Sequence, residues 1–166
     1  MQGIDVKKPA KDVERWARLA DLVLMVSREI QFRGYADERA VPLTASEGMV
    51  MRYLQSHPVA PPNEIASATG IQRTNLSTLL RGLESKGLLA RRTSPDDGRG
   101  VTVHLTQRGS SNYASARREW ATAVATAAES ETSNLDAALR LLDKIQAGLV
   151  KMRPRRAGRN MAQAEK

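Results

Sequence analysis

The sequence predicts a mainly helical fold with one small β-hairpin. Three observations support this prediction: apolar residues recur at helical spacing over most of the 166 residues, several helix starts carry capping residues, and one short stretch alternates apolar and polar residues beside a turn-rich segment. A chain of this length holds one domain with a single core and room for a dimer interface.

The first predicted helix, residues 13–32, carries apolar side chains on more than one side. Trp16 and Val23 share one face, whereas Leu24 and Met25 lie on other faces. A helix that is apolar on several sides must be covered on several sides. This favours burial against a second subunit, although the central helix of a monomer would show the same pattern.

Two short helices are predicted next. Thr44 and Glu47 form a capping box that starts a helix ending near Gln55. Pro62 and Gly70 bracket the second short helix, because proline is favoured at the first helical position and glycine just past the end. Only two residues then separate this helix from the next one.

The next predicted helix, about residues 73–86, is amphipathic and ends at Gly87. Leucines 76, 79, 80 and 83 lie on one side. The other side carries short hydrogen-bonding side chains and two arginines: Arg73, Thr74, Asn75, Ser77, Thr78 and Arg81.

A β-hairpin follows this helix. Residues 88–94 and 100–105 are strand-like, and the second stretch alternates Val101, Val103 and Leu105 with polar residues. The segment 95–99 between them contains proline, aspartate and glycine and supplies the turn. The hairpin therefore has a basic tip flanked by glycine.

Two long helices complete the predicted fold. Thr106 caps a helix over about residues 107–128, and Ser133 with Asp136 opens a last helix to about residue 150. Leucines 135, 139, 142 and 149 of the last helix repeat close to every 3.5 residues. Such a repeat favours association with another helix.

The positive charge is concentrated in two segments. The net charge is +8, and residues 72–108 contribute seven basic and three acidic side chains, a net +4. Residues 151–166 contribute a further +5, with few apolar residues, so we expect a disordered basic tail. The tail either adds sequence-independent phosphate contacts or is only a solubilising extension.

Several classes of function are excluded by composition. The chain has no cysteine and two histidines, so we expect no metal site and no cofactor. It has no nucleophile elbow and no phosphate-binding loop, and the adjacent Asp96 and Asp97 in a turn are a poor carboxylate pair, so we expect no catalytic site. Without a signal peptide or an apolar run long enough to span a membrane, a cytoplasmic protein is expected.

The order of these elements is that of a winged helix-turn-helix, and its chemistry suits double-stranded DNA. Arginine pairs with guanine, asparagine pairs with adenine, and an arginine at a hairpin tip can enter a narrow minor groove. A winged helix that only contacts proteins is the alternative function. The arginines of the helix and hairpin favour DNA.

Over roughly residues 13–150 the sequence resembles the MarR family of winged-helix transcription regulators. The stretches that carry the resemblance are Leu43-Thr-Ala-Ser-Glu47, Asn63-Glu-Ile-Ala66, Arg73-Thr-Asn-Leu76, Leu83-Glu-Ser-Lys-Gly-Leu88, Asp97-Gly-Arg99 and Leu105-Thr-Gln-Arg-Gly109. Their order and spacing are more specific than any one of them.

The resemblance implies a homodimer on a pseudo-palindromic operator, usually a repressor that releases DNA when a small anionic or phenolic ligand binds. Dimerisation helices at 11–34 and 107–150 would flank a winged helix-turn-helix at 43–106, with an N-terminal arm at 1–10. By the same likeness Asp97 braces the wing and Arg99 enters the minor groove. Gln72, Thr78 and Gly100 depart from the usual family residues, so the base sequence that is read stays open.

Two sets of site residues are predicted. The DNA-binding set is Gln72, Arg73, Thr74, Asn75, Ser77, Thr78, Arg81, Arg91, Arg92, Asp97 and Arg99. The effector-pocket set, whose residues core packing explains more readily, is Trp16, Met25, Met51, Tyr53, Tyr113 and Trp120.

Overall fold

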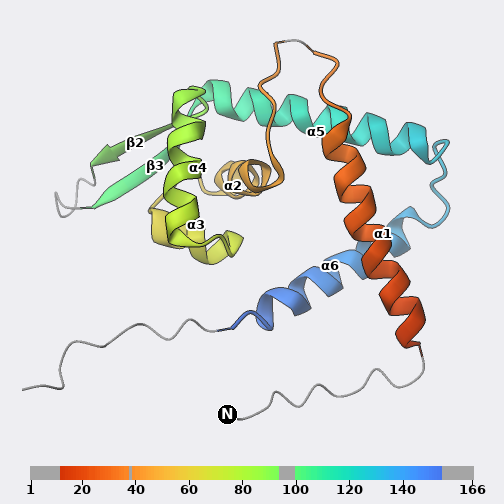
Figure 1. Ribbon diagram of the computed structural model, residues 1–166. Helices are drawn as coiled ribbons and strands as arrows, with labels where there is room; N and C mark the ends of the chain where they lie inside the picture. The colour runs from red at the N-terminus through yellow and green to blue at the C-terminus, as the bar shows by residue number, and fades with distance from the viewer. Residues whose placement is uncertain (1–11, 38, 94–99, 155–166) are drawn as a thin grey trace, which may run out of the picture. The chain divides into compact units, whose positions relative to one another are not determined.

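The computed structural model describes residues 12–37, 39–93 and 100–154. Its elements are α1 (Val13–Phe32), α2 (Ala45–Ser56), β1 (Val59–Ala60), α3 (Pro62–Thr69), α4 (Arg73–Ser85), β2 (Leu89–Thr93), β3 (Val101–Leu105), α5 (Gln107–Ala127) and α6 (Leu135–Lys151) (Figure 1). Two compact units divide between Thr126 and Ala127. The predicted mainly helical class is confirmed.

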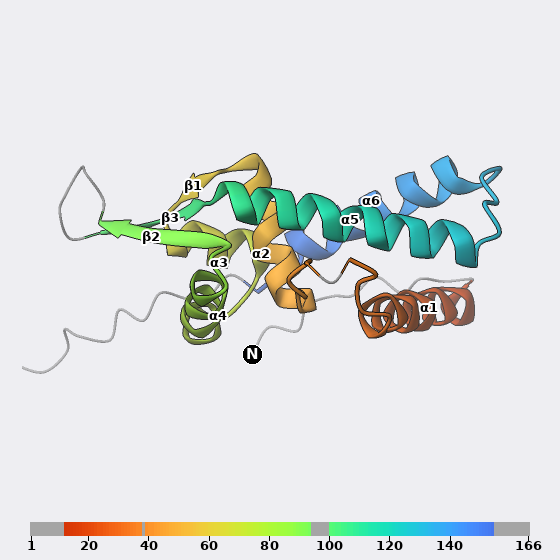
Figure 2. The same ribbon diagram turned by 90° about the horizontal axis from the view of Figure 1, so that it is seen from above.

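The small sheet has three antiparallel strands in the order β1-β3-β2, which lie side by side in Figure 2. In the hairpin, Leu89 pairs with Leu105 and Thr93 with Val101. Strand β1 was not predicted, because two residues between Pro58 and Pro61 are too few to show an alternating pattern. Strand β1 pairs with the side of β3 that faces away from β2, and it leads directly into α3.

The hydrophobic core lies under α4 and the sheet. Its largest fully buried side chains come from α2, α3, α4, β2, β3 and the turn before β2: Val50, Met51, Leu54, Ile65, Leu76, Leu83, Leu88, Leu89 and Val103. Helix α5 adds Tyr113 and Ala116 to the same cluster. Because side chains from every neighbouring element interlock here, the core gives α4 a rigid base.

Most of the predicted helix ends are confirmed. The Thr44 side chain accepts a hydrogen bond from the Glu47 amide, and the Glu47 carboxylate accepts one from the Thr44 amide. Gly70 ends α3 with a φ of 75°, a conformation that favours glycine. The Thr106 hydroxyl accepts from the Gly109 amide at 2.9 Å and so caps α5.

The predicted start of the last helix was wrong by one residue. The N-cap of α6 is Asn134, and Asn134 makes no side-chain capping bond. The amide of Ser133 donates instead to the carboxylate of Glu131. Ser133 is therefore held in the preceding turn.

Helices α1 and α6, each considered by itself, contain no buried residue. In α1, Met25 is 63% exposed and Phe32 is 74% exposed. In α6, the repeated leucines 135, 139, 142 and 149 are all at least 41% exposed. No helix among the described residues is long and apolar enough to cross a membrane.

The predicted arm lies outside the described residues, as does the tail from residue 155 onward. Lys151, where the predicted tail begins, is the last residue of α6.

Candidate nucleic-acid interface

Helix α4 presents a polar face opposite the core. Leu76, Leu80 and Leu83 are buried on one side. Residues three to four apart share a face of a helix, so the opposite side carries Thr74, Thr78 and Arg81, which are all exposed. An Arg81 guanidinium nitrogen donates to the Thr78 hydroxyl at 3.2 Å. Asn75 is also exposed, on the flank of this face.

A second row on α4 faces the wing formed by β2 and β3. Arg73 and Ser77 line a pocket together with Gly100 and Val101 at the start of β3. About two turns after Ser77, Glu84 contacts β2. The residues that the sequence places on one polar side of α4 therefore fall into two rows with different surroundings.

The end of α4 is fixed to α2 by Lys86. Its ammonium lies 2.6 Å from a carboxylate oxygen of Glu47 and donates to the carbonyl of Pro42 at 3.3 Å. The Glu47 side chain is 9% exposed, so this ion pair is largely shielded from water. One carboxylate thus starts α2 and holds the end of α4.

The wing is fixed to α4 by a second ion pair. Glu84 accepts from the Arg91 backbone amide at 3.0 Å and from the Arg91 side-chain Nε at 2.7 Å. These bonds hold the pKa of the Glu84 carboxyl below its usual value. Arg91 therefore pairs with Glu84 and links β2 to α4, and its contact with DNA stays a prediction.

The remaining arginines of the interface carry the unbalanced positive charge. Within the part of the chain that the structure describes, residues 72–108 include four arginines with no acidic partner: Arg73, Arg81, Arg92 and Arg108. Arg92 is exposed on β2. Asp97 and Arg99, predicted at the wing tip, lie outside the described residues.

The first residues of α4 have no side-chain cap. Gln72 is the N-cap, and its side chain makes no capping bond. The described members of the predicted DNA-binding set thus lie on two elements. Arg91 and Arg92 are on β2, and the others are on α4 or, for Gln72, at its start.

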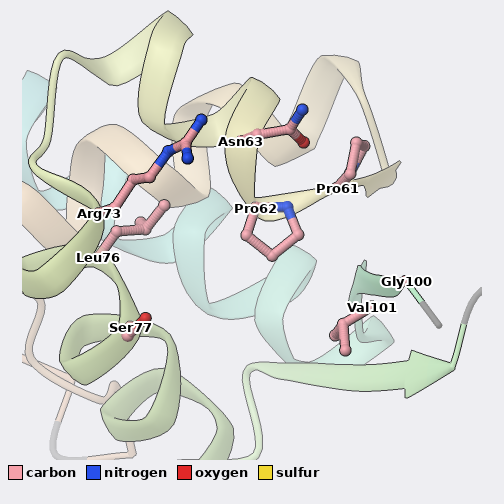
Figure 3. Close-up of a pocket in the computed structure, with 8 residues that line it drawn as sticks. All are labelled: Pro61, Pro62, Asn63, Arg73, Leu76, Ser77, Gly100 and Val101. Carbon is pink, nitrogen blue, oxygen red and sulfur yellow. The ribbon is translucent and has the colours of Figure 1, made fainter. Parts of the chain in front are cut away.

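Sequence reasoning missed Asn63, which lines the pocket beside Arg73 (Figure 3). In the sequence, Asn63 stands out only as part of a family stretch at the start of α3. No sequence signal places the start of α3 next to both α4 and the wing, because that proximity depends on the pairing of β1 with β3.

The predicted effector residues are not brought together as a set. Met51 and Tyr113 lie in the core, and Tyr113 packs edge-on against Trp120 at 6.2 Å between ring centroids. Tyr53 instead stacks on His57 at 4.4 Å. Trp16 and Met25 are exposed on α1.

Burial raises the pKa of the Tyr113 hydroxyl, and the nearby Arg117 and Arg52 oppose that shift. No group of three or more possible metal-ligating side chains occurs among residues 12–37, 39–93 and 100–154.

The model of the MarR family matches residues 41–100, which contain α2, β1, α3, α4 and the first wing strand, β2. This segment is similar to the MarR family. The resemblance drawn from the sequence is confirmed, and the chain has the fold of MarR-family transcription regulators.

Solved structures of similar fold extend the likeness beyond that segment. The reduced form of MarR from E. coli is 25% identical, with a TM-score of 0.62 over 76% of this chain and 95% of that chain. The transcriptional regulator BldR from Sulfolobus solfataricus is 20% identical, with a TM-score of 0.66 over 89% of this chain and 99% of that chain. BpsR from Bordetella bronchiseptica is 20% identical, with a TM-score of 0.60 over 78% of this chain and 98% of that chain. The DNA binding of BpsR is regulated by 6-hydroxynicotinic acid. No curated protein matched.

Proposed function

We propose that this protein is a transcription regulator that binds double-stranded DNA sequence-specifically, as a homodimer on a pseudo-palindromic operator, and represses transcription. The observation that carries the proposal is the exposed polar face of α4, which stands on a rigid core beside an arginine-bearing wing in a MarR-family segment. A polar helix face of this size fits the major groove.

Base recognition falls to the first turns of α4. Thr74, Asn75 and Thr78 are short, exposed and rich in donors and acceptors. An asparagine amide can pair with both N6 and N7 of adenine, and a threonine methyl group can contact the methyl group of thymine. Arg92 on β2 and Arg81 add positive charge that attracts the phosphate backbone.

The homodimer is supported by the exposed apolar side chains of α1 and α6. Each helix would leave several large apolar side chains in water in a monomer, at a cost of roughly 25 cal/mol for each Å² of apolar surface. A second copy of the chain covers both helices without needing another partner. Two-fold symmetry of the dimer then implies inverted symmetry of the operator.

Control by a small aromatic or anionic effector is the last part of the proposal. The regulation of BpsR by 6-hydroxynicotinic acid supports this class of ligand. The absence of cysteine in this chain argues against a thiol-based route.

Selection of bound sequences from random DNA tests the proposal. We expect enrichment of an inverted repeat whose half-sites are centred about 10 bp apart, or a multiple of that spacing. A library that shows no enrichment, while the folded protein binds another protein through α4 and the wing, would instead support a protein-interaction module.

A further inference from the structure

A pocket of about 360 Å³ lies between α4, the start of α3 and the start of β3 in the wing (Figure 3). Its lining comes from three elements: Pro62 and Asn63 at the start of α3, Arg73, Leu76 and Ser77 on α4, and Val101 on β3. Figure 3 shows the Arg73 side chain extending toward Asn63, with the Pro62 ring between the α4 residues and Val101.

The polar groups of this pocket suit an anion. The lining offers the five N–H donors of the Arg73 guanidinium, the two amide donors of Asn63 and the hydroxyl of Ser77. None of these side chains hydrogen-bonds to another described residue. Among the lining residues that the structure describes there is no carboxylate, and Arg73 gives this set a positive charge.

The rest of the lining is apolar. Leu76 is buried at the base of the pocket, the Pro62 ring is half-buried, and the Val101 side chain is 46% exposed. A free inorganic anion gains nothing from such a surface, because it has no carbon atoms to bury. A ligand with an anionic group joined to a small carbon ring uses both parts.

The location of the pocket between α4 and the wing indicates which ligand, with both an anionic group and a carbon ring, would reach it. If α4 enters a major groove and the wing reaches the adjacent minor groove, one sugar-phosphate strand must pass between them, since the backbone separates the two grooves. The pocket lies between α4 and the wing, and its donors and apolar lining match a phosphate and a deoxyribose.

We propose that this pocket holds one deoxyribose-phosphate unit of the bound duplex, with Arg73 and Asn63 on the phosphate and Pro62 and Val101 against the sugar. The proposal rests on the proposed DNA-binding function and deepens it. It assigns Arg73 to a phosphate rather than to guanine, the base with which arginine pairs, so Arg73 reads no base in this arrangement. It also adds Asn63 to the DNA-binding residues.

The first experiment compares the wild-type protein, Arg73→Ala and Arg73→Lys on the selected duplex and on random DNA at 50 and 200 mM salt. Binding of a phosphate by a cationic side chain releases counterions, so the salt slope falls by about 0.9 for each phosphate contact that the variant loses. Arg73→Ala should weaken binding to both DNAs. The ratio of wild-type to variant affinity should fall about 3.5-fold between the two salt concentrations for each phosphate that the variant no longer binds.

Arg73→Lys separates phosphate binding from base reading. Lysine binds phosphate as a point charge, whereas the planar fork of arginine suits two-point pairing with guanine. We therefore expect the lysine variant to keep the wild-type salt slope and the wild-type preference for the selected duplex. Loss of that preference in either Arg73 variant would overturn the proposal.

A second experiment locates the phosphate. Single phosphates of the selected duplex are replaced by uncharged methylphosphonates, one position at a time. One position in each half-site should weaken binding of the wild-type protein and have no further effect on Arg73→Ala, with Asn63→Ala showing a partial loss at the same position. If no position becomes silent in Arg73→Ala, the pocket does not hold a phosphate. Failure of the wild-type protein to bind any duplex would instead contradict the proposed function itself.

Discussion

At the scale of single residues, two carboxylates fix the position of α4. Glu47 of α2 binds Lys86 at the end of α4, and Glu84 in the last turns of α4 binds Arg91 of β2, so these pairs hold α2 and the wing against that helix. The sequence predicted Glu47 as a helix cap, but not its partner Lys86, because 39 residues separate the two and only the fold brings them together. Arg91 is only seven residues from Glu84, but their pairing depends on how the turn between α4 and β2 folds, so the sequence did not reveal it.

The Glu84–Arg91 pair predicts a pH dependence of stability. The pKa of the Glu84 carboxyl is lowered in the folded protein from its ordinary value, first by its hydrogen bonds to Arg91. The contribution of this pair is therefore complete above the ordinary pKa of a glutamate and is lost as the pH falls through the lowered pKa. Urea unfolding of wild type and Glu84→Gln should show a more stable wild type at pH 7 and a difference that disappears in acid.

A double-mutant cycle provides the control for this prediction. Arg91→Gln should lose about as much stability as Glu84→Gln, and the double variant should lose little more than either. A difference between wild type and Glu84→Gln that is the same at acid and neutral pH would show that the pair contributes nothing through its charge.

A single glycine fixes the close packing of α5 on the turn before the sheet. A Cβ atom at Gly109 would overlap the carbonyl oxygen of Leu88 and lie 2.8 Å from its carbonyl carbon. Because backbone atoms cannot swing away, Gly109→Ala should destabilise the protein by about 2 kcal/mol or more, measured by urea unfolding. Gly82→Ala is the matched control: its Cβ meets nothing within 4 Å, so it should be neutral or stabilising by up to about 1 kcal/mol. Equal stability of the two variants would contradict this packing.

At the scale of elements, local signals predicted the helices well. The capping box at Thr44, the leucine pattern of α4 and the glycines that end α3 and α4 act within a few residues, and the structure has helices where they indicate. Strand β1 and the pocket beside α4 depend on contacts between distant segments, so no local pattern could reveal them.

The exposed faces of α1 and α6 lead to a prediction for the dimer. Leu139→Glu places a charge within the leucine repeat of α6, where it disrupts an apolar interface but costs a monomer little, since Leu139 is 50% exposed. Sedimentation equilibrium at micromolar concentration should give a dimer for the wild type and a smaller species for the variant. The control Lys144→Glu alters an exposed charged residue on the opposite side of the same helix and should remain dimeric. A folded wild-type monomer would refute the dimer.

At the scale of the whole molecule, charge and fold act in different ways. The net charge of +8 attracts any nucleic acid, so it cannot distinguish one sequence from another. Specificity instead requires particular side chains in a groove at a fixed orientation, and the core beneath α4 supplies that orientation. Composition predicts the class of partner, whereas the proposed separation of base-reading from phosphate-binding residues depends on the folded arrangement of α4, α3 and the wing.

The central claim is that the first turns of α4 read the base sequence. Titration of Asn75→Ala on the selected duplex and on random DNA, at one salt concentration, tests it most directly. We expect a loss of about 1 to 3 kcal/mol on the selected duplex, roughly a 5- to 150-fold weaker affinity, and little change on random DNA. An Asn75→Ala variant that keeps the full preference for the selected duplex, or that weakens both DNAs equally, would contradict the assignment of Asn75 to base recognition.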